Sequence, residues 1–359
     1  MKVTETVRDF SQEELESLGD CLYSAGFLTF VEASHGARAR TVYFYERDAD
    51  GLSAFTVGYV YQSPIPLTFR LDEFLGPTAS PVGPHLVVNV PLRLRSRIFG
   101  RDAESRARMS EQIVDWARAE GLTAVVYSFV LGSDRPTRDA LIESGFASAF
   151  YEGDFFLPIA GSTMEEFLAS LPPGPRKHFR KDANRLARSG IQIEDVADYD
   201  EYAERLAELH AHLMTKYRRG EPEFTPESFQ AFRRLVGPQR MMLARRNDSI
   251  VGFAAAVLGH GVMHMLRYGR DPQVEEWTRL YGNLVYVESV RRAAAAGCER
   301  VHFGKGSHWA KVQRGCLFEE GHVYLRALDP ATQQRMADEL VHVDERNRAL
   351  FAERCRAGA

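Results

Sequence analysis

The sequence lacks the features that mark membrane-spanning, exported and disulfide-bonded proteins. No apolar run approaches the roughly 18–20 residues that a membrane-spanning helix needs, and the first residues, MKVTETVRDF, contain no apolar signal core. The cysteines Cys21, Cys298, Cys316 and Cys355 are scattered and form no C-x-x-C pair. In a chain of 359 residues this pattern predicts reduced thiols in a cytoplasmic protein, and neither a disulfide framework nor a zinc site.

The charge balance and the missing motifs exclude further classes of protein. With 45 basic and 49 acidic residues the formal net charge is -4, which argues against a DNA-binding protein whose whole surface is basic. The Walker phosphate loop and the G-x-G-x-x-G motif are absent, and so is the G-x-S-x-G elbow of serine hydrolases. His210 and His212 are two residues apart and do not share a helix face, so no metal centre is predicted.

What is present is the composition of an ordinary folded protein and a repeated pattern. Hydrophobic residues make up 45% and charged residues 26% of the 359 residues, which correspond to roughly two domains of about 150 residues each. In the first half, a helix pattern at 104–120 precedes a buried strand pattern at 123–130, with a glycine between them. In the second half, a helix pattern at 281–296 precedes a strand pattern at 299–303, again across a glycine. Further strands are predicted at 41–46, 54–61, 85–94, 241–246, 250–258 and 262–269.

The same order of elements twice predicts a tandem duplication. We therefore expect an α/β (α+β) fold of two similar domains, residues 1–160 and 191–359, each with a mixed central sheet flanked by helices. Connecting helices are expected at 161–190. After Asp329, apolar residues at helical spacing predict a final helix that packs on the body of the protein. These apolar residues are Met336, Leu340, Val343, Leu350 and Phe351.

The connecting segment carries a dense group of cations. Ser162 and Glu165 have the spacing of a capping box that opens a first short helix, and Pro172–Pro175 ends this helix. A second helix is predicted at 176–189, where Asp182 is the only acid. The basic residues of this helix are Arg176, Lys177, Arg180, Lys181, Arg185 and Arg188.

The cations at 177, 181, 185 and 188 are spaced three and four residues apart, so they share one face of the predicted helix. Phe179, Ala183 and Leu186 form the opposite, buried face. A cationic stripe of this kind is suited to binding a pyrophosphate, a nucleotide or a tRNA backbone. The alternative interpretation is a solvated helix face in an arginine-rich protein.

Three stretches of the second half carry a family resemblance. They are SLPPGPRKHFRKDANRLARSGI at 170–191, LYGNLVYVESVRRAAAAGCERVHFGKG at 280–306 and GKGSHWAKVQRG at 304–315. Together they resemble the FemAB-like branch of the Gcn5-related N-acetyltransferase (GNAT) superfamily. The first half matches only in element order and in SGFASAFYEGDFFLPI at 144–159. The resemblance implies two GNAT-like domains in tandem, and transfer of an acyl or aminoacyl group from a large anionic carrier, acyl-coenzyme A or aminoacyl-tRNA, to an amine.

A glycine turn in the second half is the first candidate for binding the carrier. Gly304, Lys305 and Gly306 follow a predicted strand, where closely approaching backbone amides can hold an anion. Lys311 and Arg314 lie within the next helical turns and can reach the same place. The alternative interpretation is a plain turn between a strand and a helix.

The first half offers a second candidate for the donor site. The pyrophosphate loop of the single-domain acetyltransferases, Q/R-x-x-G-x-G/A, has no match before the long helix of the second half, where DPQVEEWTRLYGN stands. An imperfect version occurs in the first half as SRIFGRDAESR, with Arg97, Gly100 and Arg101. Both a donor loop in the first domain and an aminoacyl-tRNA donor therefore stay open.

Amine acylation requires a base for the attacking ammonium and a group that stabilises the oxyanion. His308, which follows the glycine turn, is the preferred base. Tyr281, Tyr268 and Glu288 are further candidates, although Glu288 on an apolar helix face fits a structural ion pair better. Transfer without a protein base is an alternative, because an aminoacyl ester is already activated.

The sequence thus predicts an N-acyltransferase without a permanently bound cofactor. Its donor substrate would be acyl-coenzyme A or aminoacyl-tRNA, and its acceptor a small-molecule or peptide-like amine. Transfer RNA is the one nucleic acid partner under consideration, since DNA binding and a membrane span are not expected. A non-catalytic binding module that retained the fold is the alternative function.

Overall fold

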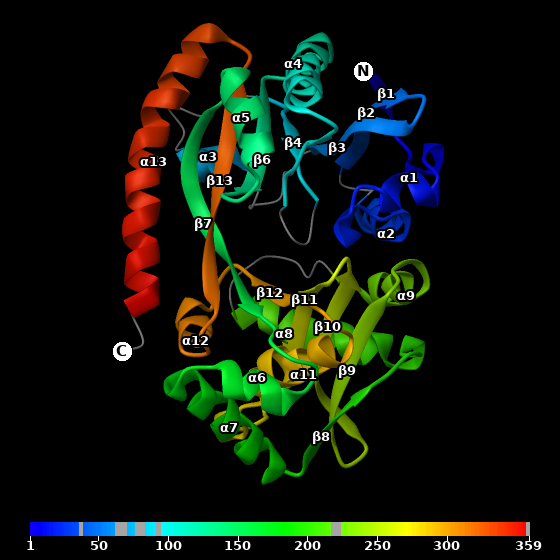
Figure 1. The fold of residues 1–359 in the computed structure, drawn as a ribbon, viewed down its shortest axis with the longest axis vertical. Helices are drawn as coiled ribbons and strands as arrows, with labels where there is room; N and C mark the ends of the chain where they lie inside the picture. Colours follow the sequence, from blue (N-terminus) through cyan, green and yellow to red (C-terminus); the bar gives the residue numbers. More distant parts are fainter. Residues whose placement is uncertain (36–38, 62–69, 76–82, 91–94, 217–223, 357–359) are drawn as a thin grey trace. The chain divides into compact units, whose positions relative to one another are not determined.

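The computed structural model describes residues 1–35, 39–61, 70–75, 83–90, 95–216 and 224–356 (Figure 1). The chain forms two compact units. The first unit comprises Met1–Asp154 and Glu319–Ala359, and the second comprises Phe155–Phe318.

The first unit is built on a mixed sheet. Its strands follow one another in the order β1 (Lys2–Thr4), β2 (Ala39–Asp48), β3 (Gly51–Tyr61), β4 (Leu86–Val88), β6 (Ala124–Leu131), β13 (Leu317–Ala327) and β7 (Ala147–Pro158). β4 and β6 pair in parallel, whereas β2–β3, β3–β4 and β6–β13 pair antiparallel. A two-residue strand, β5 (Phe99–Gly100), pairs with β3.

Helices cover both faces of this sheet because its buried strands are apolar on both sides. Val125 and Tyr127 of β6 pack with α4, whereas the alternate residues Ala124 and Val126 pack with α13. The helices of the first unit are α1 (Gln12–Glu16), α2 (Ala25–His35), α3 (Leu71–Leu75), α4 (Ala103–Ala119), α5 (Arg135–Glu143) and α13 (Pro330–Arg356), with short 3-10 helices at Val7–Asp9 and Cys21–Tyr23.

The second unit repeats the mixed sheet. Its strands follow one another in the order β8 (Ile191–Asp195), β9 (Gln239–Arg246), β10 (Ser249–Gly259), β11 (Val262–Arg270), β12 (Arg300–Gly304) and the last residues of β7. β11 and β12 pair in parallel, and the other pairs are antiparallel. Its helices are α6 (Met164–Ser170), α7 (Pro173–Ala187), α8 (Ala203–Lys216), α9 (Pro226–Leu235), α10 (Leu280–Gly282), the π-helix η6 (Asn283–Val287), α11 (Glu288–Ala295) and α12 (His308–Val312), with 3-10 helices at Asp200–Tyr202 and Glu276–Thr278.

The two units confirm the predicted fold class of two similar α/β domains. In each, three antiparallel strands lead into a helix, a strand parallel to the third, a short helix and a long final strand. The elements are β2, β3, β4, α4, β6, α5 and β7 in the first half, and β9, β10, β11, α10 to α11, β12, α12 and β13 in the second.

The compact units are divided differently from the expected ranges 1–160, 161–190 and 191–359. The connecting helices α6 and α7 belong to the second unit, and the chain from Glu319 onward belongs to the first. The reason is strand pairing: β13 pairs with β6 from Gly321↔Leu131 to Ala327↔Ala124, and β7 pairs with β12 over Phe155–Pro158. A strand pattern in the sequence does not specify the partner of the strand, because hydrogen-bond partners are distant along the chain.

Two predicted helices differ in detail. The capping box of α6 is formed by Thr163 and Glu166, one residue later than the expected pair, because the Glu166 carboxylate accepts the backbone N–H of Thr163 at 3.2 Å. The expected continuous helix at 281–296 is instead interrupted by the π-helical turn η6.

The final helix α13 packs on the first unit through the predicted apolar positions Met336, Leu340 and Val343, which are buried. Leu350, in contrast, is 41% exposed. Among the described residues, no helix combines the length and the apolar character needed to cross a membrane.

We expect Leu340→Ala to destabilise the first unit by about 2–5 kcal/mol, because it removes a fully buried side chain from the α13 contact. Val341→Ala is the matched control: Val341 is the next residue and is 58% exposed, so its truncation should change stability by no more than about 0.5 kcal/mol. Hydrogen exchange of the β6 and β13 amides, measured in the full chain, reports the difference. Equal protection in the two variants would show that α13 does not stabilise this sheet.

Candidate active site in the second unit

The parallel pair β11–β12 separates after three residue pairs. The ladder runs from Val262↔Arg300 to His264↔His302, after which β11 continues along β10 and β12 continues along β7. In open α/β sheets, ligands bind outside the carboxyl ends of the parallel strands, particularly where neighbouring connections diverge. A ligand site of the second unit is therefore expected beside the residues that follow His264 and His302.

A row of aromatic side chains lies at these strand ends. The rings of Tyr268 and Tyr281 are 5.0 Å apart, those of Tyr281 and Tyr286 are 5.6 Å apart, and those of Tyr286 and Phe303 are 4.8 Å apart. The hydroxyl oxygens of Tyr281 and Tyr286 are 3.2 Å apart. Burial raises the pKa of Tyr286 well above its usual value, so this phenol stays protonated at neutral pH. The row thus places a hydrogen-bonding hydroxyl pair beside the strand ends.

The helix that carries two of these tyrosines begins irregularly. Arg279 precedes it in the left-handed region with a φ of 56°, and α10 then passes into the π-helix η6 before regular α11 begins at Glu288. Single π-helical turns are rare and occur often at functional sites. The sequence pattern did not reveal this turn, because Leu284, Val285 and Val287 fit ordinary helical spacing equally well.

A buried ion pair connects this helix start to α7 and to the end of α12. Asp182 of α7 and Arg314 pair through Oδ2 and Nη2 and are 3% and 7% exposed. The Arg314 guanidinium also lies 4.5 Å from the centre of the Tyr286 ring. Asn283 Nδ2 donates to the backbone carbonyl of Asp182 at 2.9 Å. A Cβ atom at Gly282 would come within 2.8 Å of Cγ of Asp182, so this close approach requires glycine.

The ion pair changes the character of the predicted basic stripe. Asp182, the only acid of this helix, is turned inward with Phe179 and pairs with Arg314. Lys177, Arg180, Lys181 and Arg188 are exposed and Arg185 is half-buried. None of these five cations forms an ion pair with any residue in the described part of the chain. Arg176 is the exception, since it donates to the carbonyls of Ala169 at 3.1 Å and Leu171 at 2.7 Å.

We define the basic stripe as Lys177, Arg180, Lys181, Arg185 and Arg188. Its charge is uncompensated because the one acid of α7 is used inside the unit. The predicted division of the helix into a cationic face and an apolar face agrees with the buried Phe179 and the half-buried Ala183 and Leu186. What the stripe binds remains a proposal.

Two further predicted donor-binding cations, Lys311 and Arg314, point into the protein. The Lys311 ammonium donates to the carbonyl of Gly304 at 2.6 Å, lies 5.1 Å from the centre of the Phe155 ring and belongs to a side chain that is 2% exposed. Arg314 is held by Asp182. Gly304 and Gly306 have φ values of 70° and 79°, so the turn requires the predicted glycines. Lys305 is half-buried in the same turn. Lys311 and Arg314 therefore brace the glycine turn and α7 from within.

The predicted catalytic residues have different surroundings. His308 begins α12, is 6% exposed and has its ring 5.5 Å from that of Phe155. Tyr281 belongs to the aromatic row. Glu288 is 6% exposed and pairs with Arg291 at 2.8 Å and with Arg292 at 2.5 Å. These contacts correspond to the structural alternative that the sequence indicated for Glu288.

The candidate donor loop of the first unit is neutralised by its own neighbours. Arg101 pairs with Asp48 at 2.8 Å and with Asp50 at 3.3 Å, and Arg97 lies 3.5 Å from Asp134. The Asp102 carboxylate caps α4 by accepting the backbone N–H of Ser105 at 2.7 Å. Because a carboxylate already occupies this helix start, a phosphate would meet like charge there.

Gly100 of the same loop belongs to β5 and approaches the next helix closely. A Cβ atom at Gly100 would come within 2.9 Å of Oγ of Ser105. The glycine of this loop therefore serves the packing of β5 against α4, whatever the loop binds.

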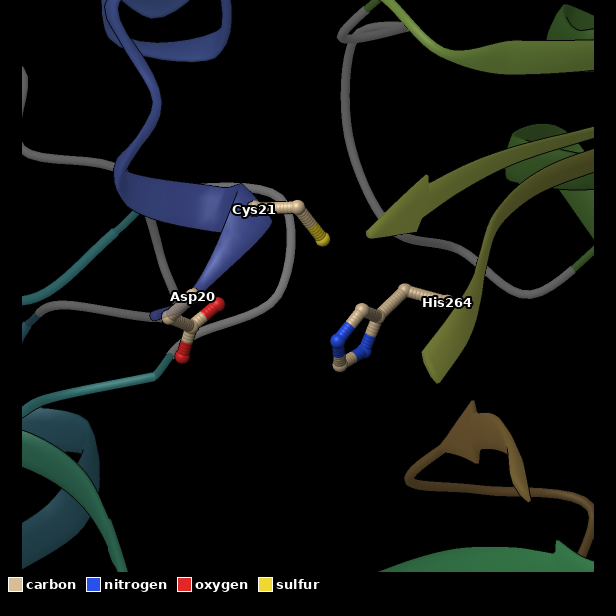
Figure 2. A group of neighbouring side chains, drawn as sticks. All are labelled: Asp20, Cys21 and His264. Atoms are coloured by element: carbon tan, nitrogen blue, oxygen red, sulfur yellow. The ribbon is translucent and has the colours of Figure 1, made fainter. Parts of the chain in front are cut away.

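Figure 2 shows Asp20, Cys21 and His264, which are all residues of types that can bind a metal ion. In the first unit, Asp20 accepts the backbone N–H of Leu22 at 3.0 Å and caps a 3-10 helix. In the second unit, the ring of His264 stacks on that of His302 at 5.1 Å. Because Asp20 and Cys21 belong to one unit and His264 to the other, we infer no metal site from these three residues.

Comparison with known protein families identifies the class of the second unit. Residues 175–311 match the family model of the Acetyltransferase (GNAT) domain. The match includes α7 from its third residue onward, the aromatic row and Lys311, and it lies within the second unit. The second unit thus contains a segment that is similar to the GNAT domain. A search among curated protein sequences gives no match.

Solved structures with the same fold extend over both units. FemX shares 12% identity with a TM-score of 0.59, over 90% of this chain and 97% of FemX. The C-terminal domain of a candidate lysylphosphatidylglycerol synthetase from Agrobacterium fabrum also shares 12% identity with a TM-score of 0.59, over 94% of this chain and 96% of that domain. L-PGS from Bacillus licheniformis shares 13% identity with a TM-score of 0.56, over 92% and 97%. At 12–13% identity these likenesses show the fold, and they confirm the predicted architecture of two GNAT-like domains in tandem.

We expect Asp182 and Arg314 to show strong energetic coupling. Asp182→Leu and Arg314→Met should each destabilise the protein by about 3–5 kcal/mol, since each leaves an uncompensated buried charge. The double variant should cost less than the sum of the two by about 0.5–3 kcal/mol in a double-mutant cycle of urea unfolding. The exposed pair Arg246–Glu275, at 2.8 Å, is the control and should show a coupling of no more than about 1 kcal/mol. Additive costs at Asp182 and Arg314 would contradict the proposed bracing role.

We also expect part of the acid sensitivity of the protein to come from His178 of α7. Burial lowers the pKa of His178 below 6.5, and the charge of Arg314 lowers it further. The unfolded chain therefore binds this proton more readily, so the stabilisation is complete above pH 6.5 and is lost as the pH falls through 6.5 toward the folded-state pKa.

The free energy of unfolding should decrease less steeply between about pH 7.5 and pH 5.5 in His178→Gln than in the unchanged protein. Burial also lowers the pKa of His322 in the first unit, so His322→Gln is a comparison variant that should reduce the slope by a separate amount. An unchanged slope in His178→Gln would contradict the expected pKa shift.

Proposed function

We propose that this protein is an N-acyltransferase that moves an acyl or aminoacyl group from a large anionic carrier to the amine of a small-molecule or peptide-like acceptor. The carrier is acyl-coenzyme A or an aminoacyl-tRNA. The observation that carries the proposal is the basic stripe: five uncompensated cations on one helix of a GNAT domain, with the acid of that helix buried against Arg314. Charge-assisted contacts to phosphate oxygens are the interactions that such an arrangement offers.

The chemistry follows from the groups near the strand ends. The acceptor nitrogen attacks the acyl carbonyl carbon, a C–N bond forms, and the bond between this carbon and the sulfur or oxygen of the carrier breaks. His308 is the proposed base that takes the ammonium proton. Tyr281, hydrogen-bonded to the protonated Tyr286, is the proposed donor to the oxyanion or to the leaving group. With an aminoacyl ester the carrier itself can accept the proton, and His308 is then dispensable.

The proteins of the same fold support an aminoacyl group as a candidate for the transferred group. The name lysylphosphatidylglycerol synthetase, carried by a protein of the same fold, denotes formation of a product that contains an aminoacyl group. At 12% identity this likeness concerns the fold and does not identify the donor of the present chain. The missing pyrophosphate loop favours tRNA over coenzyme A as the carrier.

A non-catalytic binding module is the second candidate function. It is favoured by the neutralised loop of the first unit, where Arg97 and Arg101 are paired with acids, and by the inward orientation of Lys311. Such a module would bind the anionic carrier on the stripe without consuming it. Binding and turnover therefore have to be measured separately.

A donor panel tests the proposal. Thermal shift and equilibrium binding are measured with acyl-coenzymes A and with charged tRNAs, and each donor that binds is then incubated with amine acceptors to detect release of the free carrier. Binding with acceptor-dependent release supports the enzyme. Binding without release for every donor and acceptor supports the binding module, and absence of binding by both donor classes refutes the two functions together.

We expect charge reversal on the stripe to weaken donor binding selectively. Lys181→Glu combined with Arg188→Glu should raise the Kd or KM of the donor by roughly two to four decades, since each charge-assisted contact contributes about 1.5–3 kcal/mol. The effect should shrink as salt concentration rises. Because exposed charges contribute little to folding, each change should alter stability by no more than about 0.5 kcal/mol.

The matched control is Arg234→Glu combined with Arg240→Glu, which changes the net charge equally at two exposed cations of the second unit outside α7. It should leave donor affinity nearly unchanged. Equal losses in the two double variants would indicate a non-specific electrostatic effect. Lost stability with unchanged donor affinity in the α7 variant would assign the stripe a structural role.

A further inference from the structure

Three exposed apolar side chains lie close together along the chain in the second unit. Val312, Leu317 and Phe318 are 42%, 51% and 37% exposed. They lie within seven residues of the chain, between the end of α12 and the start of β13. The only other large apolar side chain of the described second unit with comparable exposure is Trp277. We call Val312, Leu317 and Phe318 the apolar patch.

The apolar patch adjoins the proposed base. The ring of Phe318 lies 5.3 Å from that of Phe155, and the ring of Phe155 lies 5.5 Å from that of His308. Gly315, in the middle of the segment, would place a Cβ atom 3.2 Å from Cγ of Pro175, so the same segment also packs against the first turn of α7. The buried Phe155 therefore connects the exposed Phe318 to His308, and the same segment reaches the helix that bears the basic stripe.

We propose that the apolar patch binds the transferred group of the donor, and that this group is an apolar acyl or aminoacyl residue larger than acetyl. The inference rests on the proposed function. The acyl carbonyl must lie within reach of His308 during transfer, so the rest of the acyl group lies beside the residues that adjoin His308. The carrier is too polar to bind the apolar patch, and its phosphates bind the basic stripe instead.

The local charges select against a cationic group such as lysyl. The Lys311 ammonium lies 5.1 Å from the centre of the Phe155 ring, and the uncompensated cations of α7 add further positive potential. A second ammonium at this place would meet like charge, and an acidic side chain would lose solvation against the apolar patch. An aliphatic or aromatic chain has neither cost and gains from burial.

The test measures the affinity of the full chain for two donor series. One series is acetyl-, butyryl- and hexanoyl-coenzyme A, and the other consists of alanyl-, leucyl- and lysyl-tRNA. In the series that binds, affinity should rise by about fourfold for each buried methylene, and leucyl should exceed both alanyl and lysyl. In Leu317→Ser and Phe318→Ser the preference for the larger apolar group should shrink by about tenfold, whereas affinity for the acetyl or alanyl donor should change by less than about twofold.

Two variants test whether a loss of affinity comes from misfolding and not from the altered apolar patch. Leu317→Ser alters a side chain that is half exposed and is the milder of the two changes, and Val341→Ser is the control at an exposed apolar residue of the first unit. Donors that bind without any preference for chain size, or a preference that persists in both patch variants, would overturn the inference while leaving the proposed function intact. Failure of both series to bind would overturn the proposed function, and the inference with it.

Discussion

The buried ion pair between Asp182 and Arg314 holds together the part of the second unit on which the proposed chemistry depends. Removing two charges from water costs solvation free energy, and the geometry of the pair must recover it through direct contact and additional hydrogen bonds. Here the pair lies against the Tyr286 ring, and the backbone of Asp182 is bound by Asn283. Three elements, α7, the start of the long helix and the end of α12, are therefore fixed to one point.

The functional consequence is that some cations of the second unit are buried whereas others remain exposed. Lys311 and Arg314 are used inside the unit, one to close the glycine turn and the other to hold Asp182. The cations of the basic stripe remain at the surface because the acid that would have neutralised them is buried. In the first unit the cations of the candidate donor loop are neutralised instead, because Arg97 and Arg101 are paired with nearby carboxylates. The repeat thus preserved the fold in both units while their charges diverged.

The strands at the junctions explain how the repeat is assembled. β13 is the last strand of the second repeat, yet it pairs with β6 of the first, and the end of β7 pairs with β12 of the second. Each sheet is completed by a strand from the other repeat, so neither half of the sequence contains a whole sheet. This arrangement also places α13 on the first unit, far in sequence from the strands that it covers.

The sequence by itself determined the type and order of the elements, the repeat, the cationic face of α7 and the glycines of the turn, because periodicity and turn preference are local properties of the chain. The tertiary structure decided which strand completes which sheet, since hydrogen-bond partners are distant in sequence. It also decided the role of each charge. Asp182 looks in the sequence like a counter-charge within its own helix, but its partner lies 132 residues away. Burial and pairing follow from packing, which no local pattern contains.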